Sequence, residues 1–186
     1  MTVKLLALAA STRPESLNKR LLAVAVAQAQ AAGANVTVLD YAACEAPFYT
    51  GHGDTRLPHG VEVLSHALRA HDGLLLASPE YNWSIPGGLK NLIDWLSLDH
   101  TTPLRGRTAL LMCASPSARG GISGLQHLRV PLEVLGMWVY PQLIGIGDAA
   151  NQLNPTALAR EKDHLHLATS MQDFIRATSA LRVSHA

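Results

Sequence analysis

The sequence predicts an α/β fold: a doubly wound, five-stranded parallel sheet in the order 2-1-3-4-5, with helices on both faces. Apolar runs of strand length alternate with segments of helical periodicity, a pattern typical of parallel sheets. The runs Leu74–Ala77 and Thr108–Ala114 carry no charge, as expected for strands covered on both faces. Distinctive loops follow the first and third runs, where this strand order opens a crevice. With 186 residues and 48% hydrophobic content, the chain suits a single domain over residues 1–186.

The first half of the chain predicts two strands, each followed by a helix. Val3–Ala9 reads as the first strand, and the helix after it extends to Ala32, where Gly33 forms a C-terminal cap. Asn35–Leu39 is a short second strand. Residues 41–60 form an unusually long connection that contains several glycines and prolines, before a second helix over Val61–Ala70.

Leu74–Ala77 is the third strand, and Ser78 and Pro79 end it. Pro86 suits the first position of the next helix, where its missing N–H costs nothing. That helix has an apolar stripe at helical spacing and, on another face, an expected ion pair of Lys90 with Asp94.

Thr108–Ala114 is the fourth strand, and the helix after it contains Pro131, which should kink it. The fifth strand is expected over Met137–Ile146. Pro141 lacks a donor for a sheet ladder, which places this strand at an edge. Asn154 and Pro155 suit the start of the last helix, with a buried stripe at Leu158, Leu165, Ala168, Met171 and Ile175. Residues 177–186 are expected to be a frayed tail.

Composition argues against several classes of protein. Fifteen Lys plus Arg against fourteen Asp plus Glu give a net charge of +1, which does not predict binding to nucleic acid. No apolar run is long enough for a membrane span, and Cys44 and Cys113 form no metal or disulfide motif, so a cytosolic protein is expected. His52, Asp54 and His59 show no recognised ligand spacing, and no metal site is predicted.

The loop between the first strand and its helix has the residues of an anion site. Ser11, Thr12 and Ser16 offer hydroxyl groups, Asn18 an amide and Arg13 a positive charge, beside the positive end of a helix dipole. The alternative is that Ser16 is only an N-cap and the remaining residues form a solvated turn.

The loop after the third strand has a second set of ligand-binding candidates. Tyr81 and Trp83 could give aromatic packing against a ligand. Alternatively, they are core residues of a tight turn, although the neighbouring Pro, Asn and Ser favour an exposed loop.

The chain after the third strand reads Pro79-Glu80-Tyr81-Asn82-Trp83-Ser84-Ile85-Pro86-Gly87-Gly88-Leu89-Lys90-Asn91, and Asp94-Trp95 follow. This segment closely resembles the signature of the NAD(P)H-dependent FMN reductases. This flavodoxin-like family includes quinone, chromate and azo-dye reductases. Ser11, Arg13, Ser16 and Asn18 match the family's phosphate loop, whereas Ala10 stands where the family usually has glycine. Because alanine resists positive φ, this departure puts the tightest part of the turn in question.

The resemblance implies three sets of FMN contacts. The phosphate would be held by Ser11, Arg13, Ser16 and Asn18, and the ring would lie against Pro79, Glu80, Tyr81 and Asn82. A third set bordering the ring would comprise Ser115, Ser117, Gly120 and Gly121, although a Gly-Gly pair is also common in ordinary flexible turns. The resemblance further suggests a homodimer or homotetramer through the loop and helix around Tyr81 to Trp95.

The leading hypothesis is an FMN-dependent oxidoreductase. NADPH or NADH would deliver hydride to N5 of FMN, and a small acceptor such as a quinone, free flavin, chromate or azo compound would then be reduced. No catalytic side chain is expected, because the cofactor performs the redox step. The rivals are a single-electron carrier of flavodoxin type, which is usually acidic, and a flavin-free interaction subunit.

Overall fold

The computed structural model describes residues 2–51, 56–154 and 157–182. Its elements begin with β1 (Lys4–Ala9), α1 (Leu17–Ala31), β2 (Asn35–Leu39), the 3₁₀ turn η1 (Tyr41–Cys44), α2 (His59–Arg69), β3 (Gly73–Ala77) and α3 (Gly87–Leu96). They continue with β4 (Thr108–Ala114), α4 (Ile122–Val134), β5 (Trp138–Val139), β6 (Ile144–Ile146), α5 (Ala149–Gln152) and α6 (Glu161–Leu181).

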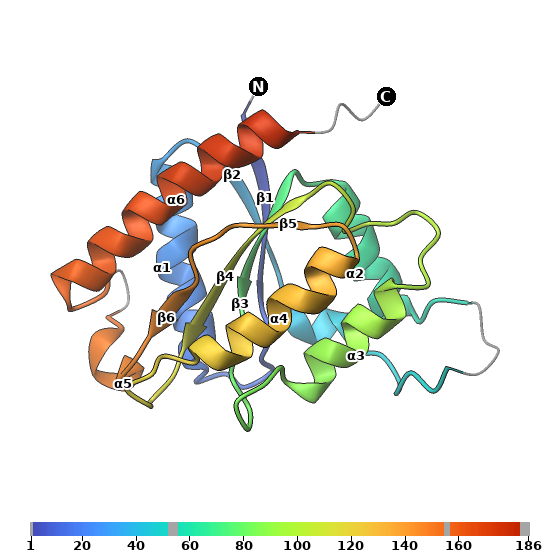
Figure 1. The fold of residues 1–186 in the computed structure, drawn as a ribbon, viewed down its shortest axis with the longest axis horizontal. Coiled ribbons are helices and arrows are strands. Elements are labelled where there is room, and N and C mark those ends of the chain that lie inside the picture. Colours follow the sequence, from blue (N-terminus) through green and yellow to red (C-terminus); the bar gives the residue numbers. More distant parts are fainter. Residues whose placement is uncertain (1, 52–55, 155–156, 183–186) are drawn as a thin grey trace.

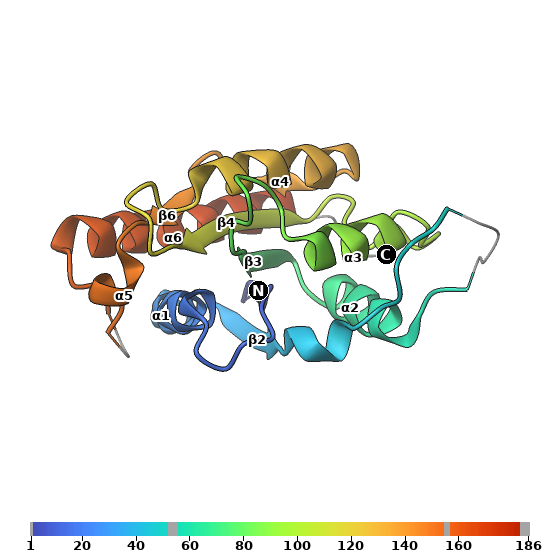
Figure 2. The ribbon, with the colours of Figure 1, turned by 90° about the horizontal axis from the view of Figure 1, so that it is seen from below.

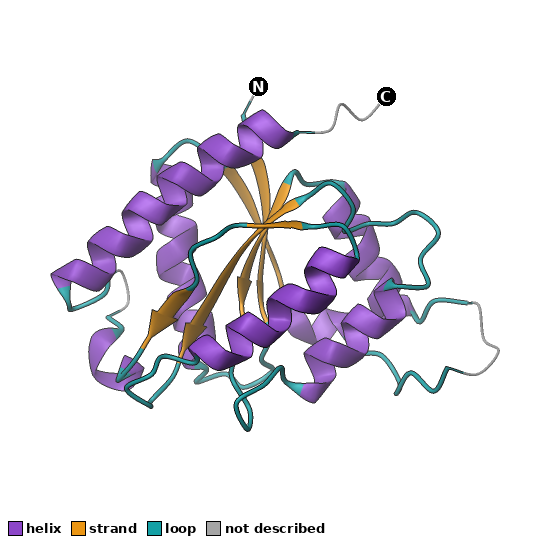
Figure 3. Cartoon of the chain, viewed as in Figure 1, coloured by secondary structure: helices purple, strands orange, loops and turns teal. Residues whose placement is uncertain are grey.

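The sheet is parallel and has the order β2-β1-β3-β4-β5, with β6 also paired to β4 (Figure 1). The predicted order is therefore confirmed. Leu8 pairs in register with Leu76, and Ala9 with Ala77, so β1 and β3 end at the same level. The loops that follow β1, β3 and β4 consequently meet at one edge of the sheet (Figure 3).

Two helical layers cover the sheet, and the residues of each central strand alternate between them. Leu5 and Ala7 pack into the core under α1 and α6, whereas Leu6 and Leu8 pack into the core under α2, α3 and α4. Figures 1 and 2 show these two groups of helices on opposite faces. Because both faces are covered, β1, β3 and β4 are almost entirely apolar, as predicted.

The prediction of one continuous fifth strand over 137–146 was wrong. Two short strands, β5 and β6, occupy the edge position, and each pairs with a different part of β4. Pro141 lies between them, where the chain leaves the ladder. The edge position inferred from Pro141 is confirmed, because a residue without an N–H cannot continue the pairing.

The prediction for the last helix was wrong at both ends. Residues 149–152 form the short helix α5, and Leu153 and Leu158 form an isolated bridge. The long helix begins only at Glu161, where Glu161 and Asp163 in its first turn suit the positive end of the dipole. Its buried side is consequently Leu167, Ser170, Met171, Phe174 and Thr178, and Leu165 is exposed.

The tail beyond Ala177 is not frayed over its described part. Helix α6 continues to Leu181, and the hydroxyl of buried Thr178 lies 2.6 Å from that of Thr108 at the start of β4. None of the described helices has the length and apolar character needed to span a membrane.

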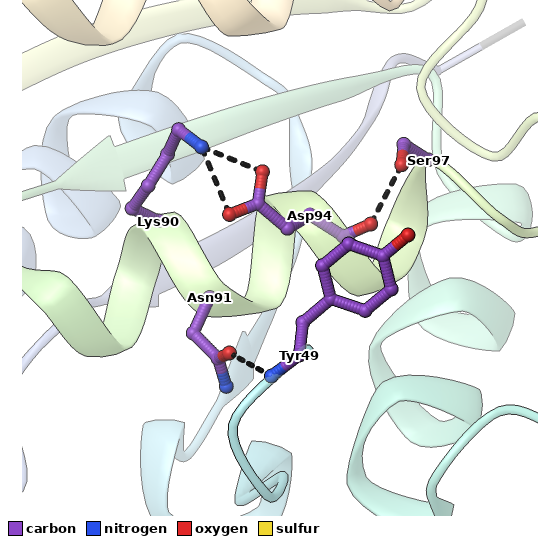
Figure 4. A network of polar contacts seen from close by, with 5 residues as sticks. All are labelled: Tyr49, Lys90, Asn91, Asp94 and Ser97. Carbon is purple, nitrogen blue, oxygen red and sulfur yellow. Dashed lines mark hydrogen bonds and ion pairs between the residues drawn. The ribbon is translucent and has the colours of Figure 1, made fainter. Parts of the chain in front are cut away.

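Part of the long connection after β2 is fastened to α3. Asn91 accepts a hydrogen bond from the N–H of Tyr49 (2.8 Å; Figure 4). Its side-chain N–H also donates to the carbonyl of Pro47 (3.0 Å). The indole N–H of Trp95 donates to the same carbonyl (2.8 Å). The family motif thus contains residues that hold a neighbouring loop. The predicted ion pair of Lys90 with Asp94 is confirmed at 2.6 Å.

Replacement of Asn91 by leucine should release the segment 46–49 from α3. Limited proteolysis of Asn91→Leu, followed by mass spectrometry, should show faster cleavage within this segment, because the hydrogen bonds of the Asn91 side chain to three backbone groups are lost. Lys90→Ala on the same helix breaks only an exposed ion pair and should be cleaved at the wild-type rate. Equal rates for Asn91→Leu and wild type would rule out the anchoring role.

Candidate active site

A cavity of about 380 Å³ lies at the edge of the sheet where the three loops meet. It contains most of the predicted site residues, contributed by segments that are far apart in sequence. Its lining is Ser11, Arg13, Glu15, Ser16, Leu17, Asn18, Pro79, Glu80, Tyr81, Ala114, Ser115 and Pro116. The two loops singled out from the sequence therefore face one cavity, as the strand order requires.

One end of the cavity is the N-terminus of α1. Ser16 is the N-cap, and its Oγ accepts a hydrogen bond from the N–H of Lys19 (3.4 Å). The first N–H groups of a helix have no acceptor within the helix, so those of Leu17 and Asn18 add donor capacity here. Ser11 Oγ accepts from the N–H of Arg13 (3.4 Å), and the Arg13 side chain is exposed. The N-cap alternative is thus true of Ser16, and it is compatible with anion binding.

Asn18 has a structural role that the sequence did not reveal. Its side-chain N–H donates to the carbonyl of Ala114 (3.1 Å), and its Oδ1 accepts from the N–H of Ala114 (2.9 Å). Both groups are buried. Asn18 therefore fixes the start of α1 to the end of β4.

Ala10 does not need the left-handed conformation that would favour glycine. It is not among the residues with positive φ, and its N–H donates to the carbonyl of Ala77 (2.9 Å), which extends the pairing of β1 with β3. The departure from the family's glycine is therefore accommodated.

Tyr81 and Trp83 lie in an exposed two-residue hairpin turn. The N–H of Tyr81 donates to the carbonyl of Ser84 (3.1 Å), and the N–H of Ser84 donates to the carbonyl of Tyr81 (3.0 Å). The side chains of Tyr81 and Trp83 are 53% and 56% exposed, so the alternative that they are core residues was wrong. Tyr81 lines the cavity, whereas Asn82 does not.

Two residues of the loop that contains the hairpin turn form contacts with α4, the helix that follows β4 in the chain. Glu80 Oε2 accepts a hydrogen bond from the N–H of Gly124 near the start of α4 (2.6 Å), and Ser84 Oγ lies 3.1 Å from Nδ1 of His127. The carboxylate of Glu80 thus binds at the positive end of α4, and this contact holds the loop of Glu80 and Tyr81, two lining residues of the cavity, against α4.

The loop after β4 brings Ser115 to the cavity, but Ser117, Gly120 and Gly121 do not line it. Gly120 and Gly121 are buried and have positive φ values of 66° and 72°. A Cβ on Gly121 would lie 2.2 Å from Sγ of Cys113, and one on Gly120 would lie 2.6 Å from the carbonyl carbon of Gly145. These glycines thus allow close packing of the loop on β4 and β6. Their predicted contact with FMN stays a prediction.

The family described as NADPH-dependent FMN reductase matches residues 3–151. The chain belongs to this family. It is 41% identical over 100 residues to the quinone reductase of Escherichia coli K12, with 53% of each protein covered. The match to a 2-hydroxy-1,4-benzoquinone reductase of Burkholderia sp. is 31% identical over 130 residues, with 69% of each covered.

The fold of this FMN reductase family member is also that of solved flavoproteins. The flavoenzyme FerB of Paracoccus denitrificans superimposes with a TM-score of 0.84 at 22% identity, covering 98% of this chain and 100% of that one. The chain spans about half the length of the E. coli relative that it matches.

The lining residues of this FMN reductase family member fit the chemistry of FMN, and the cavity has a volume usual for a small-molecule site. About 380 Å³ falls within the range of roughly 300 to 1,000 Å³ that is usual for small-molecule pockets. The end at α1 supplies donors and the positive charge of Arg13 for a phosphate, and Tyr81 with Pro79 supplies flat, partly apolar surface for a ring system.

Sequence reasoning missed four lining residues, Glu15, Leu17, Ala114 and Pro116. Each neighbours a predicted site residue in the chain, so membership of the same loop was the available signal. Glu15 is an exposed carboxylate at the phosphate end. His52 and Asp54 lie outside the described residues, and the remaining described chain has no group of three potential metal ligands.

A second cavity of about 500 Å³ lies between α1 and the edge strand β2 and shares no lining residue with the first. Its walls are mainly apolar, and Lys19 and Asp40 are among the lining residues.

The two thiols should be unreactive in the folded protein. Burial raises the pKa of Cys113 to about 12, with a further contribution from Glu80, and burial with Asp40 raises the pKa of Cys44 to about 11. Because only the thiolate reacts, iodoacetamide at pH 8 should label neither cysteine in the native protein and both in urea. Mass spectrometry reads the result, and native labelling of Cys113 would contradict its buried placement.

Proposed function

We propose that this protein is an FMN-dependent NAD(P)H oxidoreductase that reduces a small acceptor, with quinones as the favoured class. Flavins, chromate and azo compounds are further acceptors within the proposal. The observation that carries it is the convergence of the α1 anion site and the Tyr81 loop on one cavity. Membership of the FMN reductase family and the quinone reductase relatives support it.

The residues of the chain would bind and orient the cofactor. Arg13, Ser11, Ser16 and the first N–H groups of α1 hold the phosphate, and Asn18 keeps that cradle on β4. Tyr81, Pro79 and the backbone at Glu80 border the ring. FMN, when bound, supplies the redox chemistry by accepting hydride from the coenzyme and passing two electrons to the acceptor.

The quaternary structure and location are part of the proposal. We propose a homodimer or homotetramer through the segment 81–95, supported by the exposure of Tyr81 and Trp83 beside the cavity. Light scattering of the purified protein tests this. We also propose a cytosolic location, supported by the two cysteines, which are both free thiols in the structure.

The test is to add FMN to purified protein and then NADPH or NADH under anaerobic conditions, followed by a quinone. The flavin absorbance should bleach with the coenzyme and return with the quinone. A bound flavin that the coenzymes do not bleach would favour the single-electron carrier. A protein that binds no FMN would favour the flavin-free interaction subunit.

A further inference from the structure

Trp83 has a backbone conformation that is unfavourable for its residue type. Asn82 and Trp83 have φ values of 49° and 65°, and two hydrogen bonds between Tyr81 and Ser84 close the turn. Turns with two successive positive φ values strongly favour Asn-Gly. Asparagine fits the first position, but the second carries the largest side chain in place of glycine, at a cost of roughly 1 to 2 kcal/mol. Strain of this kind is commonly retained at functional sites.

The ring of Trp83 gains little from the core of its own protein. It is 56% exposed and belongs to neither hydrophobic core. Its one aromatic or cation–π contact among the described residues is with Arg119, whose guanidinium carbon lies 4.5 Å from the ring centroid. The strained turn therefore places an exposed ring against an arginine of the neighbouring loop.

The backbone that carries Arg119 is also fixed. The N–H of Arg119 donates to Ser117 Oγ (3.3 Å), and the N–H of Gly120 donates to the carbonyl of Ser117 (3.2 Å). The side chain is exposed, and over the described part of the chain no carboxylate lies within ion-pair distance of it. The cation–π contact with Trp83 uses none of its hydrogen-bond donors, so its N–H groups can bind a planar or bidentate anion.

The contact between Arg119 and Trp83 joins two loops that line the candidate active site. Trp83 is two residues from Tyr81, and Arg119 is three residues from Pro116, both of which line the cavity. The N-terminus of α1 and Arg13, on a different loop, already provide the site for the FMN phosphate. Arg119 is therefore a second arginine near the site, and the FMN phosphate does not account for it.

We propose that Arg119, held by Trp83, binds the 2′-phosphate of NADPH and makes the enzyme prefer NADPH to NADH. This inference rests on the proposed function. NADPH and NADH differ only in that phosphate, a dianion whose oxygens match the fork of guanidinium donors. Arg119 is the specificity residue, and Trp83 is its positioning residue.

A binding measurement tests the inference without relying on turnover. Calorimetry in the presence of saturating FMN compares adenosine 2′,5′-bisphosphate with 5′-AMP, which lacks the 2′-phosphate. The wild-type protein should bind the bisphosphate about 10 to 100 times more tightly, as expected for a charge-assisted phosphate contact. Arg119→Gln should remove this difference and leave the affinity for 5′-AMP unchanged. Equal affinity of the wild type for the two nucleotides would overturn the inference.

Steady-state kinetics adds a second measure, the ratio of kcat/KM for NADPH to that for NADH. Arg119→Gln should lower this ratio about 10- to 100-fold, mainly through KM for NADPH, and Arg119→Lys should restore part of it. Arg105→Gln removes an exposed arginine at the opposite edge of the sheet and should leave the ratio unchanged. An equal loss with both coenzymes, or a change confined to KM of the quinone, would contradict the proposal.

Trp83→Gly separates the positioning role from a merely structural one. Glycine suits the second position of this turn, so the variant should melt at the wild-type temperature or above it. It should nevertheless lower the NADPH-to-NADH ratio, because Arg119 loses the surface that orients it. If Trp83→Gly leaves the preference for NADPH over NADH unchanged, Trp83 does not position Arg119.

The wild-type protein separates this inference from the proposed function. If it oxidises neither coenzyme but still binds adenosine 2′,5′-bisphosphate more tightly than 5′-AMP, the result counts against the proposed function and not against the Arg119 site.

Discussion

Replacement of Gly121 by alanine should lower the free energy of unfolding by about 3 kcal/mol, the largest effect on stability expected here. Two costs add. Gly121 has a φ of 72°, which an alanine adopts only with strain, and its new Cβ would lie 2.2 Å from Sγ of Cys113 in the buried strand β4. Urea denaturation of the two proteins measures the difference.

Two further variants separate these costs. Gly87→Ala adds a methyl group where nothing lies within 4 Å, at the start of α3, and should not destabilise the protein. In a Cys113→Ala background, Gly121→Ala should cost only about 1 kcal/mol, because most of the clash is removed while the unfavourable φ remains. An undiminished cost in that background would show that the contact with Cys113 is not the cause.

Replacement of Arg13 by glutamine should raise the Kd for FMN about 10- to 100-fold, the usual range for one charge-assisted hydrogen bond to a phosphate. Arg13 lines the end of the cavity at the N-terminus of α1, and its exposed side chain has no ion-pair partner in the described part of the chain. Quenching of flavin fluorescence on binding gives the Kd.

Riboflavin, which lacks the phosphate, is the matched ligand for this variant. Arg13→Gln should leave its affinity at the wild-type value, and Arg105→Gln should leave both affinities unchanged. If Arg13→Gln weakens FMN and riboflavin equally, Arg13 supports the loop as a whole and does not contact the phosphate.

The sequence was sufficient for the order of the sheet and for the position of the cavity. Uncharged runs at β3 and β4 predict strands buried on both faces, and the strand order then brings the Ser11 and Tyr81 loops together. The predictions failed at the last helix and at the edge strand, where local sequence signals did not indicate the actual boundaries. Asn154 resembles a helix start, yet the acidic first turn at Glu161 marks the actual one. Pro141 indicated an edge but not that the edge strand would divide in two.

The details of the site depend on long-range contacts that no local pattern encodes. The predicted contact of Asn18 with the phosphate stays a prediction, and the sequence did not reveal that its side chain also binds the backbone of Ala114, 96 residues away. The predicted contact of Gly121 with FMN likewise stays a prediction, and the close approach of this glycine to the side chain of Cys113 could not be predicted. Trp83 is a candidate for aromatic packing from the sequence, but only the fold places its ring against Arg119.

In the proposed complex, one cavity holds the phosphate of FMN at α1 and its ring at the Tyr81 loop. This arrangement is tested by titrating ¹⁵N-labelled protein with FMN and following the amide chemical shifts. The largest shifts are expected at Ser16, Leu17 and Asn18 and at Glu80 and Tyr81, with Val38 and Leu39 at the second cavity unchanged. Shifts centred on Val38 and Leu39, or none at all, would contradict it.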